Sequence, residues 1–293
     1  MELELENKSE PIIIAYEENR DKSNYALRKK SLTKALTSEI IEVSTHVGCP
    51  CNCLKYCPQE VTLSRYKGER SFSRQSFQHA LASVPEYVEI RFSGFCEPFT
   101  NRSTIDLMQY AYDCGHQVSL YSTFYGASAE DIEQLANIPL SIFCLHLWDG
   151  EVMNFQLTQE YMKNVFKAIQ VVKAENSQVM FMKKGAFKTC NRENFVRKLT
   201  RKSHSVGYCP VLKDTDFVLL PNGNVQLCCM DFGLEHTLGN LLKEDYGSIK
   251  ARFNKTKHFS LCERCSYSIT PVRHNLRRLM GLPRKHIRYL REG

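Results

Sequence analysis

Apolar and polar positions follow two different rhythms along residues 39–184. Segments with apolar residues at helical spacing separate short, β-rich runs, and 158–175 is the clearest of these helical segments. Helices that alternate with buried strands predict βαβ units and a parallel sheet. We therefore expect an α/β fold, an open or partial (β/α)6 barrel. The expected strands are 39–45, 87–93, 116–123, 139–147 and 177–184, with a weak sixth strand near 204–208; the helix 158–175 has Tyr161, Val165, Ala168 and Val172 on one face.

The pattern changes after about residue 205. The stretch "FVLLPNGNVQLCC" (217–229) reads as two short strands around Asn222 and Gly223, a pair that favours a tight hairpin turn. We expect four regions along the chain. They are an N-terminal extension (1–38), the partial barrel (39–205), a small cysteine-bearing domain of hairpin and helix (206–268) and a basic helical tail (269–293).

Composition narrows the class of protein. Of 293 residues, 43% are hydrophobic and 24% are charged, which is typical of a globular chain with a sizeable core. No apolar run approaches the ~20 residues of a membrane helix, and the N-terminal segment lacks the features of a signal peptide. We expect a cytoplasmic protein with no membrane partner. Thiols stay reduced in that compartment, so the 13 cysteines are interpreted as metal ligands or buried thiols rather than disulfides.

The net charge of +7 is concentrated at the C-terminus. Residues 271–293 hold seven Arg or Lys against one Glu, so the rest of the chain is close to neutral. Such a tail can attract phosphates, acidic lipids or an acidic partner. We favour a solvated amphipathic helix, because apolar residues in the tail offer a face for docking. Near-neutral charge elsewhere argues against a nucleic-acid partner.

Four cysteines crowd into "GCPCNCLKYCPQ" (48–59), directly after the first expected strand. Active sites of parallel α/β sheets lie beyond the carboxyl ends of the strands, so this loop is placed at the functional face. Cys49, Cys53 and Cys57 are evenly spaced, and Cys51 lies between the first two. Three thiolates can hold three irons of a 4Fe–4S cluster and leave the fourth iron open to another ligand.

A strand followed by such a loop, ending in "KYCPQ", resembles the cluster motif of the radical S-adenosylmethionine (SAM) superfamily. The usual spacing is Cys-x3-Cys-x2-Cys; the Cys-x3-Cys-x3-Cys found here is a minority variant among members that act on aminosugars. The resemblance implies that Cys49, Cys53 and Cys57 bind the cluster, with Cys51 as the competing ligand. It also implies that SAM binds the open iron and yields a 5'-deoxyadenosyl radical, with an electron from a flavodoxin- or ferredoxin-type donor.

Two further segments resemble SAM-binding positions of that superfamily. "FSGFCEPF" (92–99) is similar to its GGEP segment, in which the Glu contacts the amino group of SAM, although Cys96 stands where Gly is usual. A surface carboxylate is the alternative interpretation of that Glu. The second segment is Ser122 and Thr123, which follow the third expected strand at a position that often contacts SAM in that superfamily, and Tyr56 stands where its members place an aromatic residue near the adenine. The residues expected to contact SAM are Tyr56, Gly94, Glu97, Ser122 and Thr123.

The second cysteine group resembles the SPASM/twitch appendage of the superfamily. Its pattern is Cys-x13-Gly-x4-Cys followed by a distant Cys-x2-Cys. Four ligands imply one auxiliary 4Fe–4S cluster, although Cys229 could substitute for its neighbour and a zinc site would use the same four thiolates. The expected ligands are Cys209, Cys228, Cys262 and Cys265.

The resemblance implies a radical SAM enzyme that removes hydrogen from a small sugar-derived substrate. Dehydrogenation, dehydration or epimerisation of a carbohydrate, aminosugar or cyclitol is the favoured reaction, with the auxiliary cluster as a candidate electron acceptor. A peptide-modifying maturase and a non-catalytic metal-stabilised binding or electron-transfer protein are the alternatives. Oxidation of a hydroxyl also needs a base. The candidate catalytic residues are His146, Asp149, Lys184 and Asp231, each of which also has an ordinary structural explanation.

Overall fold

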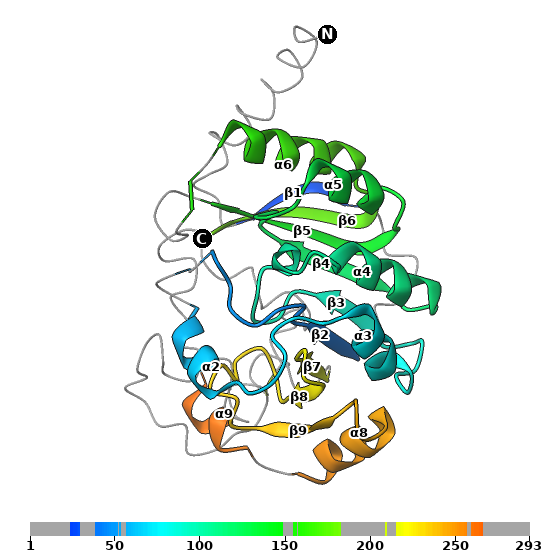
Figure 1. The fold of residues 1–293 in the computed structure, drawn as a ribbon, viewed down its shortest axis with the longest axis vertical. Helices are drawn as coiled ribbons and strands as arrows, with labels where there is room; N and C mark the ends of the chain where they lie inside the picture. Colours follow the sequence, from blue (N-terminus) through cyan, green and yellow to red (C-terminus); the bar gives the residue numbers. More distant parts are fainter. Residues whose placement is uncertain are drawn as a thin grey trace, which may run out of the picture.

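A computed structural model describes residues 24–29, 39–51, 53, 57–148, 155–156, 158–182, 209, 215–256 and 259–265 (Figure 1). The strands are β1 (Asn24–Lys29), β2 (Ile40–Val43), β3 (Glu89–Phe92), β4 (Val118–Ser122), β5 (Leu140–Trp148), β6 (Ala174–Met182), β7 (Asp216–Leu219), β8 (Asn224–Gln226) and β9 (Thr237–Asn240). The helices are α2 (Gln59–Arg65), α3 (Arg74–Leu81), the 3-10 turn η1 (Pro98–Thr100), α4 (Thr104–Asp113), α5 (Ala129–Leu135), α6 (Gln159–Val171), α8 (Tyr246–Lys255) and α9 (Ser260–Arg264).

All described strands join one sheet in the order β1-β6-β5-β4-β3-β2-β7-β8-β9. The five strands expected between residues 39 and 184 are present as β2 to β6, and neighbouring strands among them pair in parallel. The α/β, partial-barrel fold is therefore confirmed. The weak strand expected near 204–208 lies outside the described residues, as does the basic tail.

Short polar residues start the helices that cross between the strands. Ser73 and Ser128 form capping boxes at the starts of α3 and α5, and Thr158 accepts the backbone N–H of Tyr161 at the start of α6. These caps satisfy backbone donors that the first helical turn leaves unpaired. In α6 the buried residues include Val165 and Ala168, as the helical spacing predicted.

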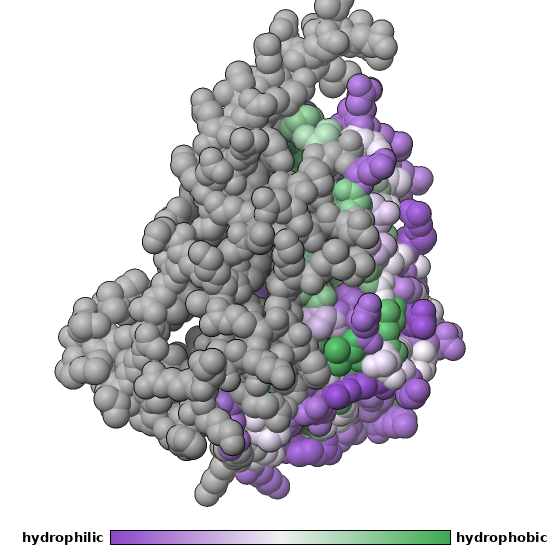
Figure 2. Space-filling view, turned by 90° about the vertical axis from the view of Figure 1, so that its left-hand side faces the viewer, coloured by the Kyte–Doolittle hydropathy of each residue, from purple (hydrophilic) through white to green (hydrophobic). Residues whose placement is uncertain are grey.

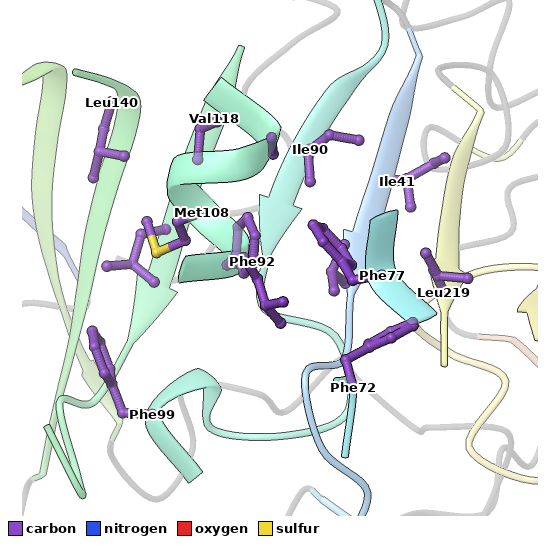
Figure 3. Close-up of a cluster of buried hydrophobic side chains, with 14 of the residues drawn as sticks. Ile41, Phe72, Phe77, Ile90, Phe92, Phe99, Met108, Val118, Leu140 and Leu219 are labelled. Carbon is purple, nitrogen blue, oxygen red and sulfur yellow. The ribbon is translucent and has the colours of Figure 1, made fainter. Parts of the chain in front are cut away.

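The hydrophobic core lies between the helices and one face of the sheet. Phe77 of α3 and Met108 of α4 pack there in a cluster with side chains from the strands (Figure 3). Each large apolar side chain buried in this way contributes about 1.5–3 kcal/mol to folding. Figure 2 shows the side of the molecule that lies on the left in Figure 1, where the visible described residues are mostly hydrophilic with some apolar side chains among them. The labelled strand residues of the core are Ile41, Ile90, Phe92, Val118, Leu140 and Leu219.

The expected hairpin of residues 217–229 is formed by β7 and β8, which pair antiparallel. Gly223 occupies the turn with a φ of +83°, a backbone conformation that glycine adopts without steric cost. The hairpin does not stand apart from the barrel. Strand β7 pairs in parallel with β2, so the sheet runs on from one predicted region into the next. The predicted domain boundaries themselves stay predictions.

Several elements were not singled out from the sequence, among them two strands at the ends of the sheet and a helix. Strand β1 comes from the N-terminal extension and pairs antiparallel with β6, which lies at the opposite end of the parallel part of the sheet from β7. Strand β9 and helix α8 extend the C-terminal part beyond the hairpin (Figure 1). None of the helices in the described part of the chain is long and apolar enough to cross a membrane.

Candidate functional site

The cysteine loop follows β2 at the carboxyl ends of the parallel strands, where the sequence placed it. Cys51 and Cys53 are buried and pack with Cys144 of β5 and Met180 of β6. Cys49 and Cys57 are partly buried and pack against the same group. The loop thiols therefore gather over the inner side of the sheet. Tyr56 lies outside the described residues.

Glu97 is the centre of a buried hydrogen-bond network. Its Oε1 accepts the Ser122 hydroxyl at 2.5 Å, and its Oε2 accepts both the backbone N–H and the hydroxyl of Thr123 at 2.7 Å. The Glu97 side chain also caps η1 by accepting the backbone N–H of Phe99. Burial raises the pKa of Glu97, and these hydrogen bonds oppose that rise. Three of the residues predicted to contact SAM are thus brought together from the end of β4 and the segment after β3.

The Glu97 network touches the cysteine loop through Thr123. The Cys51 thiol lies 3.5 Å from the Thr123 hydroxyl oxygen, within hydrogen-bond distance for sulfur. The hydrogen bond with Cys49, followed by burial, raises the pKa of Cys51, while the same hydrogen bond lowers the pKa of Cys49. The arrangement favours a thiolate at Cys49, which is the form that binds metal.

Gly94 allows the segment that carries Glu97 to approach β2 closely. Its φ is +74°, and a Cβ at this position would lie only 2.3 Å from the Oγ of Ser44. The same Ser44 hydroxyl accepts the backbone N–H of Phe95 at 2.8 Å. Only glycine fits both the backbone conformation and the space.

Gln59 joins the cysteine loop to the Glu97 segment, and sequence reasoning assigned it no role. Its Oε1 accepts the Cys49 N–H at 3.3 Å, while its Nε2 donates to the Cys57 sulfur at 3.0 Å and to the Phe95 carbonyl at 2.6 Å. The available signal was its place at the end of the "KYCPQ" motif. Its partners lie as far as 36 residues away along the chain.

Aromatic side chains border the same region. Tyr125 and Phe155 pack against the cysteine cluster, with ring centroids 4.8 Å apart. Tyr161 stacks edge-on against Phe155 and donates its hydroxyl to the Thr123 carbonyl at 2.8 Å. The sequence had indicated Tyr161 only as a core residue and had not singled out the other two as site residues.

Polar and charged side chains, with Cys144, line part of the sheet face opposite the core, and we call this set the inner wall: Glu42, Glu89, Arg91, Tyr121, Cys144, His146 and Asp216. Strand alternation separates Arg91 from the core residues Ile90 and Phe92. The Arg91 guanidinium lies 3.0 Å from Glu89, 3.6 Å from Glu42 and 3.7 Å from Asp216. Its positive charge is therefore shared among three buried carboxylates. Cys144 connects this wall to the cysteine loop.

His146 faces the same side as Tyr121, whose ring stacks on Arg91 at 5.2 Å. The Tyr121 and His146 rings meet edge to face at 6.0 Å. His146 Nε2 is buried and has no hydrogen-bond partner among the described residues. Burial lowers the pKa of His146 from 6.5 to about 4, so its imidazole is neutral at physiological pH. A neutral imidazole can accept a proton or a hydroxyl hydrogen bond.

The other candidate catalytic residues lie elsewhere. Asp231 is fully buried in the C-terminal part, where its two oxygens accept the backbone N–H groups of Glu235 and His236. These two hydrogen bonds hold the loop in place and engage both oxygens of the carboxylate. Asp149 and Lys184 lie outside the described residues.

The second cysteine group gathers in the C-terminal part. Cys228, Cys262 and Cys265 are buried in the core, and Cys209 and Cys229 are partly buried against the same core. Burial, followed by the charges of neighbouring thiols, raises the pKa of Cys228; similar causes raise the pKa of Cys262 to about 12. The predicted ligands converge, and a set made only of thiols suits an iron–sulfur cluster. No three His, Cys, Asp or Glu side chains in the described ranges form a site for a single metal ion.

Comparisons with known proteins agree with this arrangement. Residues 209–266 match the SPASM iron–sulfur cluster-binding domain. The structure of BtrN in complex with AdoMet and 2-DOIA has 18% sequence identity and a TM-score of 0.51, over 76% of this chain and 86% of that one. Its likeness shows the fold. No curated protein matches the sequence significantly.

Two further solved structures are less similar. anSMEcpe with bound AdoMet has 12% identity and a TM-score of 0.48, over 78% of this chain and 83% of that chain. SuiB of Streptococcus suis, bound to its precursor peptide SuiA, has 12% identity and a TM-score of 0.45, over 79% of this chain and 70% of that chain.

Proposed function

We propose that this chain, a radical SAM enzyme with a C-terminal SPASM domain, removes hydrogen from a small hydroxylated or amino-substituted ring. The substrate class is a sugar, aminosugar or cyclitol, and dehydrogenation is the reaction that the site favours over dehydration or epimerisation. The observation that carries the proposal is the polar inner wall, which adjoins the cysteine loop through Cys144 and presents a neutral His146.

The residues of the cysteine loop fit a cluster that binds SAM. Cys49, Cys53 and Cys57 would hold it, and the neighbouring thiol of Cys51 is the alternative ligand. Glu97, kept in place by Ser122 and Thr123, would accept a hydrogen bond from the ammonium group of SAM. When bound, the cluster and SAM supply a 5'-deoxyadenosyl radical that takes one hydrogen atom from the substrate.

Gly94 and Tyr56 complete the proposed SAM site. Gly94 lets the segment that carries Glu97 lie against Ser44. Tyr56, just before Cys57, is proposed to stack near adenine because of its place in the motif.

His146 would accept the hydroxyl proton as the carbinol carbon is oxidised. Removal of a hydrogen atom and a proton leaves one electron that must be transferred to an acceptor. We propose the auxiliary site as the place of that acceptor. Cys209, Cys228, Cys262 and Cys265 would hold the acceptor of that electron. The redox balance of a two-electron oxidation is then complete, with 5'-deoxyadenosine and a carbonyl as products.

The charge of the inner wall limits the substrate further. Arg91 faces Glu42, Glu89 and Asp216, so its guanidinium is already paired and the described wall carries no surplus positive charge. A phosphate would be repelled by these carboxylates, whereas a hydroxyl or ammonium group would be attracted. This argues against a nucleotide-linked sugar and for a neutral or amino-bearing ring.

The test begins with anaerobically reconstituted protein. We expect about eight irons per chain, matching sulfide and 5'-deoxyadenosine after reduction with SAM. Zinc without sulfide, or clusters that never cleave SAM, would contradict the enzyme assignment. Candidate rings, including 2-DOIA and neutral cyclitols, are then compared with the SuiA peptide. Stimulation of 5'-deoxyadenosine by the rings, with a product two mass units lighter, supports the proposal; stimulation only by the peptide would favour a maturase.

A matched pair of variants separates hydrogen abstraction from proton removal. His146→Gln should still form 5'-deoxyadenosine with the active ring while losing most of the oxidised product. His79→Gln changes an exposed histidine of α3 in the same way and should behave as the wild type. Equal product yield from all three proteins would remove His146 from the mechanism.

A further inference from the structure

We infer that Gln59 is a positioning residue that locks the two ends of the cysteine loop together and raises the reduction potential of the SAM-binding cluster. The inference rests on the proposed function, because it concerns the cluster that Cys49, Cys53 and Cys57 would hold. It comes from three hydrogen bonds of one buried carboxamide, none of which the sequence motif by itself specified.

The Gln59 side chain has every polar group in use. Its carbonyl oxygen accepts the Cys49 N–H, and its two amide hydrogens have two acceptors, the Cys57 sulfur and the Phe95 carbonyl. A carboxamide is the group that supplies two donors and an acceptor at one position. The reversed orientation would turn Oε1 toward the Phe95 carbonyl, 2.6 Å from the present nitrogen, and place two acceptors against each other.

Gln59 itself is anchored by a rigid element. It is 5% exposed and is the first residue of α2. Farther along that helix, Thr62 donates to the Phe232 carbonyl at 2.8 Å and Arg65 donates to the Gly233 carbonyl at 2.8 Å. Contacts with the C-terminal part therefore hold the helix, and the helix holds the amide against the loop.

The three partners belong to three functional segments. Cys49 begins the ligand set, Cys57 ends it, and Phe95 lies two residues before Glu97. A single side chain thus ties the position of the cluster loop to the position of the carboxylate proposed to bind SAM. Loss of the amide would loosen both together.

The bond from Gln59 to Cys57 has an electronic consequence as well. An N–H group that donates to a cysteine sulfur withdraws electron density from it and stabilises the more negative, reduced form of a cluster. Removing the donor should therefore lower the reduction potential. From the typical strength of a hydrogen bond to a charged group, we expect its loss to change the ratio of reduced to oxidised cluster about tenfold. For a one-electron couple this change corresponds to ~59 mV.

Two substitutions and a matched control test the inference. Gln59→Glu keeps an oxygen for the Cys49 N–H but removes both donors and adds charge; Gln59→Leu removes all three bonds. Gln75→Glu makes the same change on the exposed surface of α3. Each reconstituted protein is titrated with dithionite and followed by electron paramagnetic resonance with and without SAM. The signal that changes on SAM addition identifies the relevant cluster and separates it from the auxiliary one.

We expect the SAM-responsive signal of both Gln59 variants to need a lower potential, with Gln59→Glu shifted further, while Gln75→Glu matches the wild type. Loss of the SAM-responsive cluster alone, with about four irons and normal thermal unfolding retained, also supports the positioning role. Wild-type potentials and iron content in Gln59→Leu would overturn the inference. A wild-type protein without any SAM-responsive signal would instead overturn the proposed function.

Discussion

Thr123 donates both its backbone N–H and its hydroxyl to the same oxygen of Glu97, each at 2.7 Å. The two residues follow neighbouring parallel strands, β3 and β4, and lie far apart in the sequence. Two donors from one residue fix the orientation of the carboxylate as well as its position. The relation also places Thr123 between Glu97 and the thiol of Cys51.

Replacing Glu97 by Gln should weaken SAM binding at least tenfold. The neutral amide loses the charge that would attract the ammonium group of SAM. It would also turn an N–H toward the donors of Ser122 or Thr123, at a cost of about 1–3 kcal/mol, and so disturb the orientation of the side chain. Isothermal titration of SAM into the reconstituted protein measures the loss. Glu130→Gln, on the exposed start of α5, serves as the control. Unchanged SAM affinity in Glu97→Gln would show that this carboxylate does not contact the ligand.

Replacing Arg91 by Met should destabilise the fold by about 3–5 kcal/mol. The change leaves Glu42, Glu89 and Asp216 as buried carboxylates without their shared cation. Urea denaturation followed by circular dichroism measures the difference in unfolding free energy. Arg74→Met removes an exposed arginine whose distance to Asp106 is 3.9 Å and should change stability by less than about 1 kcal/mol. Similar small effects from both variants would contradict the buried-network interpretation.

His146 should make stability fall as the pH falls from 6.5 to about 4. Its folded-state pKa is depressed by burial, so the unfolded chain binds the proton more readily in that window. The contribution of the neutral histidine to the unfolding free energy is complete above pH 6.5. As the pH falls toward 4, protonation of His146 in the unfolded chain removes up to about 3 kcal/mol of that contribution. The measurement is the unfolding free energy of wild type minus that of His146→Gln at each pH. A difference that stays constant between pH 7 and pH 4 would disprove the depressed pKa.

Cys228 and Cys229 should behave differently although they are adjacent. Cys228 is buried in the same core as Cys262 and Cys265, whereas Cys229 is only partly buried against that core. Cys228→Ser should lose about four irons per chain and keep the SAM-responsive cluster, while Cys229→Ser should retain about eight. Iron analysis of anaerobically reconstituted proteins distinguishes the two. The reverse result would assign the ligand to Cys229.

Much of the fold could be predicted because its causes are local. The alternation of β-rich runs and helical segments is encoded residue by residue, and it yielded strands β2 to β6 and the parallel sheet. Strand β1 was missed because its place depends on pairing with the edge of β6, 150 or so residues later along the chain. An edge strand in an extension has no periodic helix beside it to indicate its neighbours.

The candidate site divides in the same way. The "FSGFCEPF" segment indicated Glu97, the position after the third expected strand indicated Ser122 and Thr123, and the structure brings these three together. The same reasoning listed Asp231 as one of four candidate catalytic residues, and in the structure its oxygens accept loop N–H groups in the C-terminal part. A carboxylate that caps a loop and one that faces a substrate look alike in sequence.

The sequence by itself determined the chemistry available: thiolates at cluster spacing, a carboxylate after the second parallel strand, and the helices and strands that carry them. Tertiary structure alone decided which groups meet. Pairing of β2 with β7 brings Asp216 to Arg91, and packing of α2 against the C-terminal part sets Gln59 between Cys49 and Cys57. Such contacts depend on strand order and on long-range packing, and spacing along the chain does not encode them.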